Sequence, residues 1–358
     1  MPRAARSPRQ TRRHDLHPDH LGLAARHDAR TVPVTGDLTA ADRAAARPGR
    51  SVPPDVLVIG SANADLVVAV DRRPAAGETV LGGDLVVQPG GKGANQAVAA
   101  ARLGARAAFA GCLGDDAHGD LLLASLTAAG VDVTLARRLA GVPTGVALIS
   151  VTPDGDNAII VSPGANAQVG TGDVERALRT DGGADGGARV VVLQLELPPP
   201  VVAHAAVRAA GAGARVVLNP APPAPLPPAV LAVCDPLVLN AHEAGVLLGL
   251  RGPAGPGAAD ALLALGPRSV VLTLGAGGAV VADPAGTTVV AAPRVTPVDT
   301  TGAGDALIGA LAWRLVSGDG LVEAVRFAVR VASTATLRPG AQPSFPHPDE
   351  VLPAGPDR

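Results

Sequence analysis

The sequence predicts an α/β protein with a Rossmann-like, doubly wound central sheet and a small β-sheet lid. From residue 189 onward, short apolar runs that end in polar residues alternate with helical segments, which is typical of a buried parallel sheet. Two stretches, at about 64–88 and 144–161, instead alternate apolar and polar residues between Gly and Pro. They predict a small antiparallel sheet that stands off the main body and either covers a site or pairs with another copy.

The composition excludes several classes of protein. The 358 residues are 47% hydrophobic, which suits a large core, and the formal charge of −2 argues against a nucleic-acid partner, which needs a basic surface. No apolar run approaches the length of a membrane span, so no membrane partner is expected. Cys112 and Cys234 lie in apolar surroundings without paired spacing, which indicates buried thiols of a cytoplasmic protein rather than a disulfide or a metal site.

The chain is expected to form one large domain with short additions at both ends. Residues 1–52 are rich in Arg, lack sustained periodicity and contain no apolar signal region. They predict a disordered extension, or a start site chosen too far upstream. The folded domain is expected over 53–350 with the lid inside it, and residues 351–358 are expected to form a tail.

The first strand is expected at 55–60, and the polar segment 61–65 follows it. Because no G-x-G-x-x-G pattern is present, this segment does not indicate a dinucleotide site. Asn63 and Asp65 fit either of two roles: they form a turn, or they hold sugar hydroxyls, since a carboxylate accepts hydrogen bonds and an amide both donates and accepts. A lid strand is expected from 79 to 87.

A glycine-rich loop at 88–93 opens an Ala-rich helix that is expected to end near Leu103. Its lysine, Lys92, is the only Lys among the 30 Lys and Arg residues of the chain. The spacing is not that of a Walker A loop, but glycines let a ligand approach the backbone closely. Lys92 is therefore either a chance leftover of composition or a compact positive charge placed for a ligand.

Polar residues stand at or beside the carboxyl ends of four successive strands of the predicted sheet. In open α/β sheets, ligands bind along this edge. One such residue is ordinary, but four together predict a site. They are Glu196, Asn219, Asn240 and Thr273.

Residues 296–316 are expected to organise the site, because an extended segment leads through Gly302-Ala303-Gly304 into an apolar helix. Backbone N–H groups at such a helix start, together with the helix dipole, bind anions. Asp305 would repel an anion there. Its position makes sense if it accepts a proton from a hydroxyl while the amides hold the phosphoryl group that this hydroxyl attacks. The alternative is a Gly-capped turn with Asp as an ordinary helix-start residue.

The chain from about 55 to 346 resembles the ribokinase-like carbohydrate kinases of the phosphofructokinase-B type. The resemblance implies a ribokinase-like fold, transfer of a phosphoryl group from ATP to a sugar, and a homodimer formed through the lid. The motifs that carry it are SANAD at 61–65, GGKGANQA at 90–97, NPAP at 219–222, DTTGAGDA at 299–306 and GAQPS at 340–344.

The resemblance also implies roles for individual residues on the sugar side. Asp305 corresponds to the catalytic base, and Gly302, Ala303 and Gly304 correspond to the anion hole. The residues that match the sugar-binding set are Asn63, Ala64, Asp65, Gly91, Lys92, Gly93, Ala94, Asn95, Glu196 and Asp305.

Further roles are implied on the nucleotide side. The residues that match the ATP site are Asn219, Thr273, Leu274, Gly275, Ala276, Gly277, Gly278, Gly304 and Val329. Mg²⁺ is linked to Asn240 and Glu243. The residues that match a monovalent cation site for K⁺, several of them through backbone carbonyls, are Asp299, Thr301, Ala335, Arg338, Gly340 and Ser344. The chain departs from the family pattern at Ala306, Leu307 and Val329, which concerns the choice of substrate and nucleotide rather than the reaction.

The expected reaction is ATP-dependent phosphorylation of D-ribose at O5, which gives D-ribose 5-phosphate. The alternative substrate is 2-deoxyribose, another sugar or a nucleoside. A nucleoside needs an apolar or aromatic wall, of which a chain with three Phe, one Trp and no Tyr is expected to offer little. A sugar sensor without turnover is the rival from another class, and the intact Asp305, Lys92 and Gly302-Ala303-Gly304 argue against it.

Overall fold

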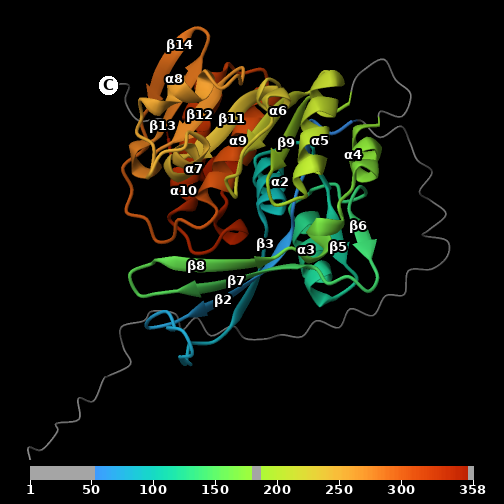
Figure 1. Ribbon diagram of the computed structural model, residues 1–358, viewed down its shortest axis with the longest axis vertical. Coiled ribbons are helices and arrows are strands. Elements are labelled where there is room, and N and C mark those ends of the chain that lie inside the picture. Colours follow the sequence, from blue (N-terminus) through green and yellow to red (C-terminus); the bar gives the residue numbers. More distant parts are fainter. Residues whose placement is uncertain (1–52, 180–186, 354–358) are drawn as a thin grey trace, which may run out of the picture. The chain divides into compact units, whose positions relative to one another are not determined.

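The computed structural model describes residues 53–179 and 187–353 (Figure 1). The predicted extension over 1–52 and residues 354–358 of the predicted tail lie outside the described residues, so the domain boundaries stay predictions. Within the described ranges, no helix has the length and hydropathy needed to cross a membrane.

An eight-stranded sheet forms the centre of the fold, as the sequence predicts (Figure 1). The strands from β4 to β12 pair in parallel, and β13 and β14 add an antiparallel extension that the sequence analysis did not identify. In spatial order the strands are β4 (Ala107–Ala110), β1 (Val56–Ile59), β9 (Val190–Gln194), β10 (Arg215–Asn219), β11 (Cys234–Asn240), β12 (Val270–Thr273), β13 (Ala279–Asp283) and β14 (Gly286–Val290).

Helices cover both faces of this sheet and create two separate cores. Side chains alternate along a strand, so Val56 and Val58 of β1 enter one core while Leu57 and Ile59 enter the other. The first core is completed by α2 (Lys92–Arg102), α3 (Ala117–Ala128), α9 (Ala303–Val316) and α10 (Leu321–Ala335). The second is completed by α4 (Thr171–Leu178), α5 (Pro199–Gly211), α6 (Pro228–Leu231), α7 (Ala241–Leu247) and α8 (Ala258–Leu263). Cys112 and Cys234 are both buried in the second core, as expected.

A four-stranded sheet forms the predicted lid. Its spatial order is β3 (Val86–Gly90), β2 (Asn63–Ala69), β7 (Gly145–Val151) and β8 (Asn157–Ser162). The remaining elements are the paired strands β5 (Cys112–Gly114) and β6 (Arg137–Leu139) and the 3₁₀ turns η1 (Gly164–Gln168), η2 (Gly275–Gly277), η3 (Gln342–Ser344) and η4 (Pro348–Glu350).

The lid differs from its prediction in three ways. It is mixed rather than antiparallel, because β2 and β7 pair in parallel across a long crossover that contains α2 and α3. The strand expected at 79–87 begins only at Val86, after Gly82 and Gly83 interrupt the alternating pattern. Asn63 and Asp65 lie within β2, so the interpretation of these residues as turn formers is wrong.

The carboxyl edge of the central sheet carries the polar residues that the sequence predicts there. Asn219, Asn240 and Thr273 are the last residues of β10, β11 and β12, and Glu196 lies two residues beyond β9. Gln194, the last residue of β9, pairs in register with Asn219 and adds a polar side chain that was not predicted. These strand ends, the start of α9 and the lid define the site.

Candidate active site

Asp305 lies in the first turn of α9, directly after a bend at Gly302. Gly302 has φ 73°, a left-handed conformation that favours glycine, and an added Cβ would lie 2.8 Å from Ala341 Cβ. The N–H groups of Gly302 and Gly304 donate to no other described residue, whereas Ala303 N–H donates to Thr300 O at 3.2 Å. The predicted anion hole therefore has two available amides instead of three, because the turn before the helix already uses the N–H group of Ala303.

Two side-chain amides of α2 hold Asp305, which is only 8% exposed. Asn95 Nδ2 donates to Asp305 Oδ2 at 2.9 Å, and Gln96 Nε2 donates to Asp305 Oδ1 at 2.9 Å. The helices approach closely because Gly309 of α9 has no side chain: a Cβ there would lie 2.7 Å from Gln96 O. Gln96 was not predicted as a site residue, although its place directly after Asn95 in the glycine-loop motif was a usable signal.

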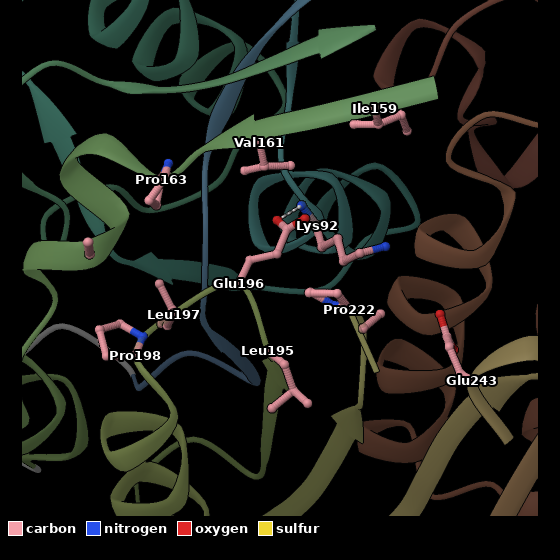
Figure 2. A pocket seen from close by; sticks show the side chains of 12 residues that line it. Lys92, Ile159, Val161, Pro163, Leu195, Glu196, Leu197, Pro198, Pro222 and Glu243 are labelled. Atoms are coloured by element: carbon pink, nitrogen blue, oxygen red, sulfur yellow. Dashed lines mark hydrogen bonds between the residues drawn. The ribbon is translucent and has the colours of Figure 1, made fainter. Parts of the chain in front are cut away.

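Glu196 reaches from beyond β9 into the centre of the site (Figure 2). Its Oε2 accepts from Ser61 Oγ at 2.5 Å and from Lys92 N at 3.2 Å. Ser61 also accepts from Gly93 N at 3.4 Å, so one serine ties the end of β1 to the glycine loop and to Glu196. Ser61 was missed because its predicted neighbours, Asn63 and Asp65, carry the more conspicuous polar groups.

Lys92 lies among four carboxylates and forms no direct ion pair with a described residue. Burial acts to lower the pKa of its ammonium, but the charges of Asp305, Glu196, Glu243 and Asp65 outweigh this and raise the pKa above its ordinary value. Figure 2 shows the side chain extending from the side of Glu196 toward that of Glu243. The lysine is thus charged and free to meet an anionic ligand.

Asp65 faces the opposite situation. Burial, followed by the charges of Glu196 and Asp305, raises its pKa from 3.8 to about 7, although Lys92 acts in the other direction. A carboxyl with this pKa changes its charge near neutral pH. Burial removes water from this carboxyl, and the hydroxyl of a bound sugar can replace the lost hydrogen bond.

Asn63 is oriented by a residue that the sequence analysis missed. Asn166 Nδ2 donates to Asn63 Oδ1 at 2.8 Å, and the Asn166 side chain also pairs with both backbone groups of Ala62. Since its oxygen is engaged, Asn63 presents N–H donors to the site beside the acceptor Asp65. Asn166 lies about 100 residues away in the chain, in η1, so no local pattern pointed to it.

Three of the residues predicted to bind the sugar lie behind the site rather than on its surface. Ala64 is fully buried, and Gly93 and Ala94 donate their amides to Ser61. Their contribution is to hold β2 and α2 against the end of β1.

A cavity of about 600 Å³ opens between the lid and the strand ends. Lys92 and Glu196 lie in its middle, with Ile159 and Val161 of β8 on one side and Pro222 on the other (Figure 2). The apolar wall that the composition was expected to lack is therefore present, built from aliphatic residues and prolines instead of aromatics. The complete lining is Lys92, Ile159, Val161, Pro163, Ala167, Leu195, Glu196, Leu197, Pro198, Ala221, Pro222 and Glu243.

Asn240 and Glu243 form the capping box of α7. Glu243 N donates to Asn240 Oδ1 at 2.9 Å, and Asn240 N donates to Glu243 Oε2 at 2.9 Å. Asn219 Nδ2 donates to Val238 O at 3.0 Å and to the same Glu243 oxygen at 3.4 Å, which joins three of the predicted residues. Burial raises the pKa of Glu243, while the hydrogen bond from Asn240 and the charge of Lys92 oppose the shift.

The predicted adenine loop has mixed accessibility. Gly275, Ala276 and Gly277 are exposed after β12, whereas Val329 of α10 is only 3% exposed and packs in the core. The loop can contact a nucleotide through its backbone, but Val329 can contribute little more than a small apolar surface.

The residues predicted to hold a monovalent cation are only partly brought together. Asp299 accepts hydrogen bonds from Thr301 N, Thr301 Oγ1 and Gly340 N at 2.6–2.8 Å. Asp299 therefore joins two loops, and this structural role was not predicted from the sequence. The Arg338 side chain instead pairs with Glu350, which leaves only its carbonyl for a cation. Ser344 Oγ donates to Ala341 O, and Ala335 ends α10.

The described residues contain no cluster of three or more His, Cys, Asp or Glu side chains that could enclose a metal by itself. Mg²⁺ bound together with nucleotide phosphates needs only one or two protein carboxylates. Glu243 fits this role, because the hydrogen bonds that Asn219 and Asn240 donate to its side chain both use Oε2.

A buried carboxylate lies beside helix-start amides and a lysine that have no direct partner among the described residues. Transfer of a phosphoryl group to an alcohol requires groups of these kinds, a proton acceptor and donors for the phosphate. Residues 53–348 match the profile of the pfkB family carbohydrate kinases. The chain therefore belongs to this family of carbohydrate kinases.

Individual relatives agree with this assignment. Ribokinase from Bacillus subtilis is 39% identical over 297 residues, which cover 83% of this chain and 98% of the relative. Deoxyribokinase from Salmonella typhi is 33% identical over 296 residues, which cover 82% of this chain and 95% of the relative. The solved structure of Arabidopsis thaliana ribokinase complexed with ribose and ATP superposes with a TM-score of 0.74 at 33% identity, over 84% of this chain and 97% of that one. The ribokinase-like fold is thereby confirmed.

Proposed function

We propose that the protein transfers the γ-phosphoryl group of ATP to O5 of D-ribose and so forms D-ribose 5-phosphate. The observation that carries the proposal is the environment of Asp305, a proton acceptor held on both oxygens by amides and lying beside the unpaired N–H groups of Gly302 and Gly304. The similarity to ribokinases, one of them solved with ribose and ATP, supports the choice of sugar and nucleotide.

In the proposed mechanism, Asp305 accepts the proton of the attacking hydroxyl as the new oxygen–phosphorus bond forms. The amides of Gly302 and Gly304 meet the negative charge of the phosphoryl group in transfer, where preorganised donors have their largest effect. Lys92 adds a positive charge that none of the described carboxylates neutralises by direct contact.

The sugar is held by three groups of different character. Asn63 donates through its amide, Asp65 accepts, and Glu196, which lines the cavity, also accepts. Together they orient the ring so that its terminal hydroxyl points at Asp305. Glu243 would hold Mg²⁺ bound together with ATP, and the ion would neutralise phosphate charge there.

The test is ADP release by the purified protein with a panel of acceptors: ribose, 2-deoxyribose, fructose and adenosine. Ribose is expected to give the highest kcat/KM. The deoxyribokinase relatives make 2-deoxyribose the second candidate, and the aliphatic wall of the cavity is the reason to include adenosine. Equal ADP release with and without every acceptor would refute a sugar kinase.

We extend the proposal to a monovalent cation, K⁺, bound beside Asp299. Burial acts to raise the pKa of this carboxyl, but hydrogen bonds from Thr301 and Gly340 outweigh it, so the pKa is lowered and the group carries a charge at neutral pH. A cation there would also fix the segment before Gly302. Initial rates are expected to rise with KCl at constant ionic strength in tetramethylammonium buffer, and to lose this response in Asp299→Asn. A flat response in the parent would remove the cation.

A homodimer through the lid is the last part of the proposal. Leu148 and Ile160 pair across β7 and β8 and are 50% and 68% exposed, and alternation along β8 turns Ile160 away from Ile159 and Val161, which line the cavity. An exposed apolar sheet face calls for a partner. Sedimentation is expected to give twice the chain mass, and Ile160→Lys is expected to give the single mass. A cytoplasmic location likewise stays a prediction.

A further inference from the structure

Two chains of buried side-chain amides converge on Asp305. One runs from Ser125 Oγ to Gln342 Oε1 at 2.5 Å, from Gln342 Nε2 to Asn95 Oδ1 at 3.0 Å, and from Asn95 to Asp305. The other runs from Gln194 Nε2 to Gln96 Oε1 at 2.5 Å and from Gln96 to Asp305. The four amide side chains belong to residues that are at most 5% exposed, so water does not compete for these contacts.

The direction of both chains is dictated by the carboxylate. An ionised carboxylate only accepts hydrogen bonds, so Asn95 and Gln96 must turn their NH₂ groups toward Asp305. Their oxygens then face outward, and Gln342 and Gln194 must present NH₂ groups to them. Every donor in the network therefore points toward Asp305, and each hydrogen bond polarises the next.

Gln194, at the far end of the second chain, shows the effect of this fixed orientation. Gln194 Oε1 is buried and has no hydrogen-bond partner among the described residues. If this amide turned over, its oxygen would face the oxygen of Gln96, which is worse than an unpaired acceptor. A buried acceptor left unpaired is a real cost, and it is accepted here because the orientation of Gln96 is already set by Asp305.

The first chain passes through a loop that also touches the anion hole. Gln342 belongs to η3, and its neighbour Ala341 packs against Gly302. Gly340 N donates to Asp299 Oδ2 at 2.7 Å. One short loop therefore contacts the proton acceptor through a side chain and the phosphoryl side through its backbone.

We infer that Gln342 is a positioning residue for phosphoryl transfer: acting through Asn95, it keeps an amide donor on Asp305 and so fixes the carboxylate toward the attacking hydroxyl. The inference rests on the proposed function. Both ends of the Gln342 amide are used, by Ser125 and by Asn95, so this side chain links the loop 340–345 to the base.

The competing explanation is that Gln342 merely fastens its loop. The chain offers a matched control for this, because Arg102 Nη1 donates to the backbone carbonyls of Gln342 and Phe345 and thus fastens the same loop without the amide chain. Gln342→Met removes the amide at similar length, and Arg102→Met removes the backbone anchor while it leaves the amide in place.

The experiment compares kcat, sugar KM and Tm of both variants with the parent. Gln342→Met is expected to lower kcat by about tenfold with the sugar KM changed by less than about twofold, since small misplacement of a reacting group is costly in rate. Arg102→Met is expected to lower Tm at least as much while kcat stays within about twofold. Equal losses of kcat in both variants would overturn the inference, and so would parent-like kcat in Gln342→Met.

A double-mutant cycle with Asp305→Asn isolates the coupling. If Gln342 acts on the base, its substitution is expected to lower the residual rate of Asp305→Asn by less than about twofold, because no carboxylate remains to be positioned. A further tenfold loss would show an independent effect and reject the inference. If Gln342→Met does not fold, Ser125→Ala tests the same chain from its half-buried outer end and is expected to lower kcat with unchanged sugar KM; parent-like kcat there would reject the inference.

Failure of the proposed function has a different signature. A parent protein without sugar-dependent ADP release removes the phosphoryl transfer itself. A parent that turns over normally, together with Gln342 and Ser125 variants that match it, removes only the positioning role.

Discussion

The two halves of the site around Asp305 are built on opposite principles. On the sugar side, Asp305, Asn63 and Glu196 each have protein hydrogen-bond partners that fix their orientation before any ligand arrives. On the proposed phosphate side, Gly302 and Gly304 donate their N–H groups to no described residue, and Lys92 has no direct counter-ion among the described residues.

The difference teaches what each half has to do. A proton acceptor must stand at one angle to one hydroxyl, so rigid side-chain partners are useful. A phosphate brings its own charge and several oxygens, so the protein serves it best with donors that are aimed but not yet satisfied. Four substitutions break or sharpen this contrast, and they are ordered here by expected effect.

The largest effect is expected for Asp305→Asn, which removes the proton acceptor from the fixed half. Because Asn keeps the shape but cannot take the proton, kcat should fall by at least ~10²-fold, the low end for a positioned base. Sugar binding measured by calorimetry should stay nearly intact. Turnover within about tenfold of the parent would remove Asp305 from this role.

Gly302→Ala tests the open half. A side chain at φ 73° is strained, and its Cβ would approach Ala341 Cβ to 2.8 Å, so the helix start must shift and the free amides lose their aim. We expect a loss of kcat of about 30-fold, somewhat below the loss of a complete oxyanion donor. Gly304→Ala adds the same methyl group two residues further on, where its Cβ would meet nothing within 4 Å. The Tm of this variant shows how much of the loss of stability in Gly302→Ala comes from the strain at Gly302. Unchanged kcat in Gly302→Ala would mean that these amides do not serve the transfer.

Lys92→Arg asks whether the free charge of the open half needs a compact group. Arg keeps the charge, but its planar fork must fit among Asp305, Glu196, Glu243 and Asp65. kcat/KM for ATP is expected to fall roughly tenfold, less than for a lost oxyanion donor, with Tm nearly unchanged. Parent-like kinetics would make the lone lysine an accident of composition.

The smallest effect concerns stability. Since the pKa of Asp65 is raised to about 7 in the folded protein, the folded state binds more protons than the unfolded one between pH 3.8 and about 7. This carboxyl therefore destabilises the folded state increasingly as the pH rises through that window, and the loss of stability reaches its full size above it. Asp65→Asn is expected to raise Tm by a few degrees near pH 8 and to change it little near pH 4.

Asp71→Asn removes the same kind of group from an exposed position and is the control for this measurement. The same Asp65→Asn variant should bind ribose less tightly. A Tm gain that is equal at both pH values would contradict the raised pKa.

The sequence predicted the parts of this site that follow from local pattern. Strand ends place Asn219, Asn240 and Thr273, and a glycine before an apolar helix places Asp305, because these depend on neighbours in the chain. The parallel pairing of β2 and β7 was beyond such reasoning, since a long crossover separates the two strands.

The residues that hold the reacting groups were out of reach for the same reason. Asn166 orients Asn63 from 103 residues away, and Gln342 meets Asn95 across 247 residues. Each is an unremarkable amide in its own segment. Only the packing of η1 near β2 and of η3 near α2 brings these side chains together, and packing between distant segments leaves no periodic trace in a sequence.

The single lysine has a practical consequence. A reagent that acylates ε-amines finds one such group in the whole chain, and it lies inside the cavity between the lid and the strand ends. Because the raised pKa of Lys92 keeps this amine protonated, its acylation requires a pH well above neutral, whereas an ordinary α-amino group reacts near neutral pH. A protease that cuts only after lysine would yield two fragments that divide the chain at the start of α2.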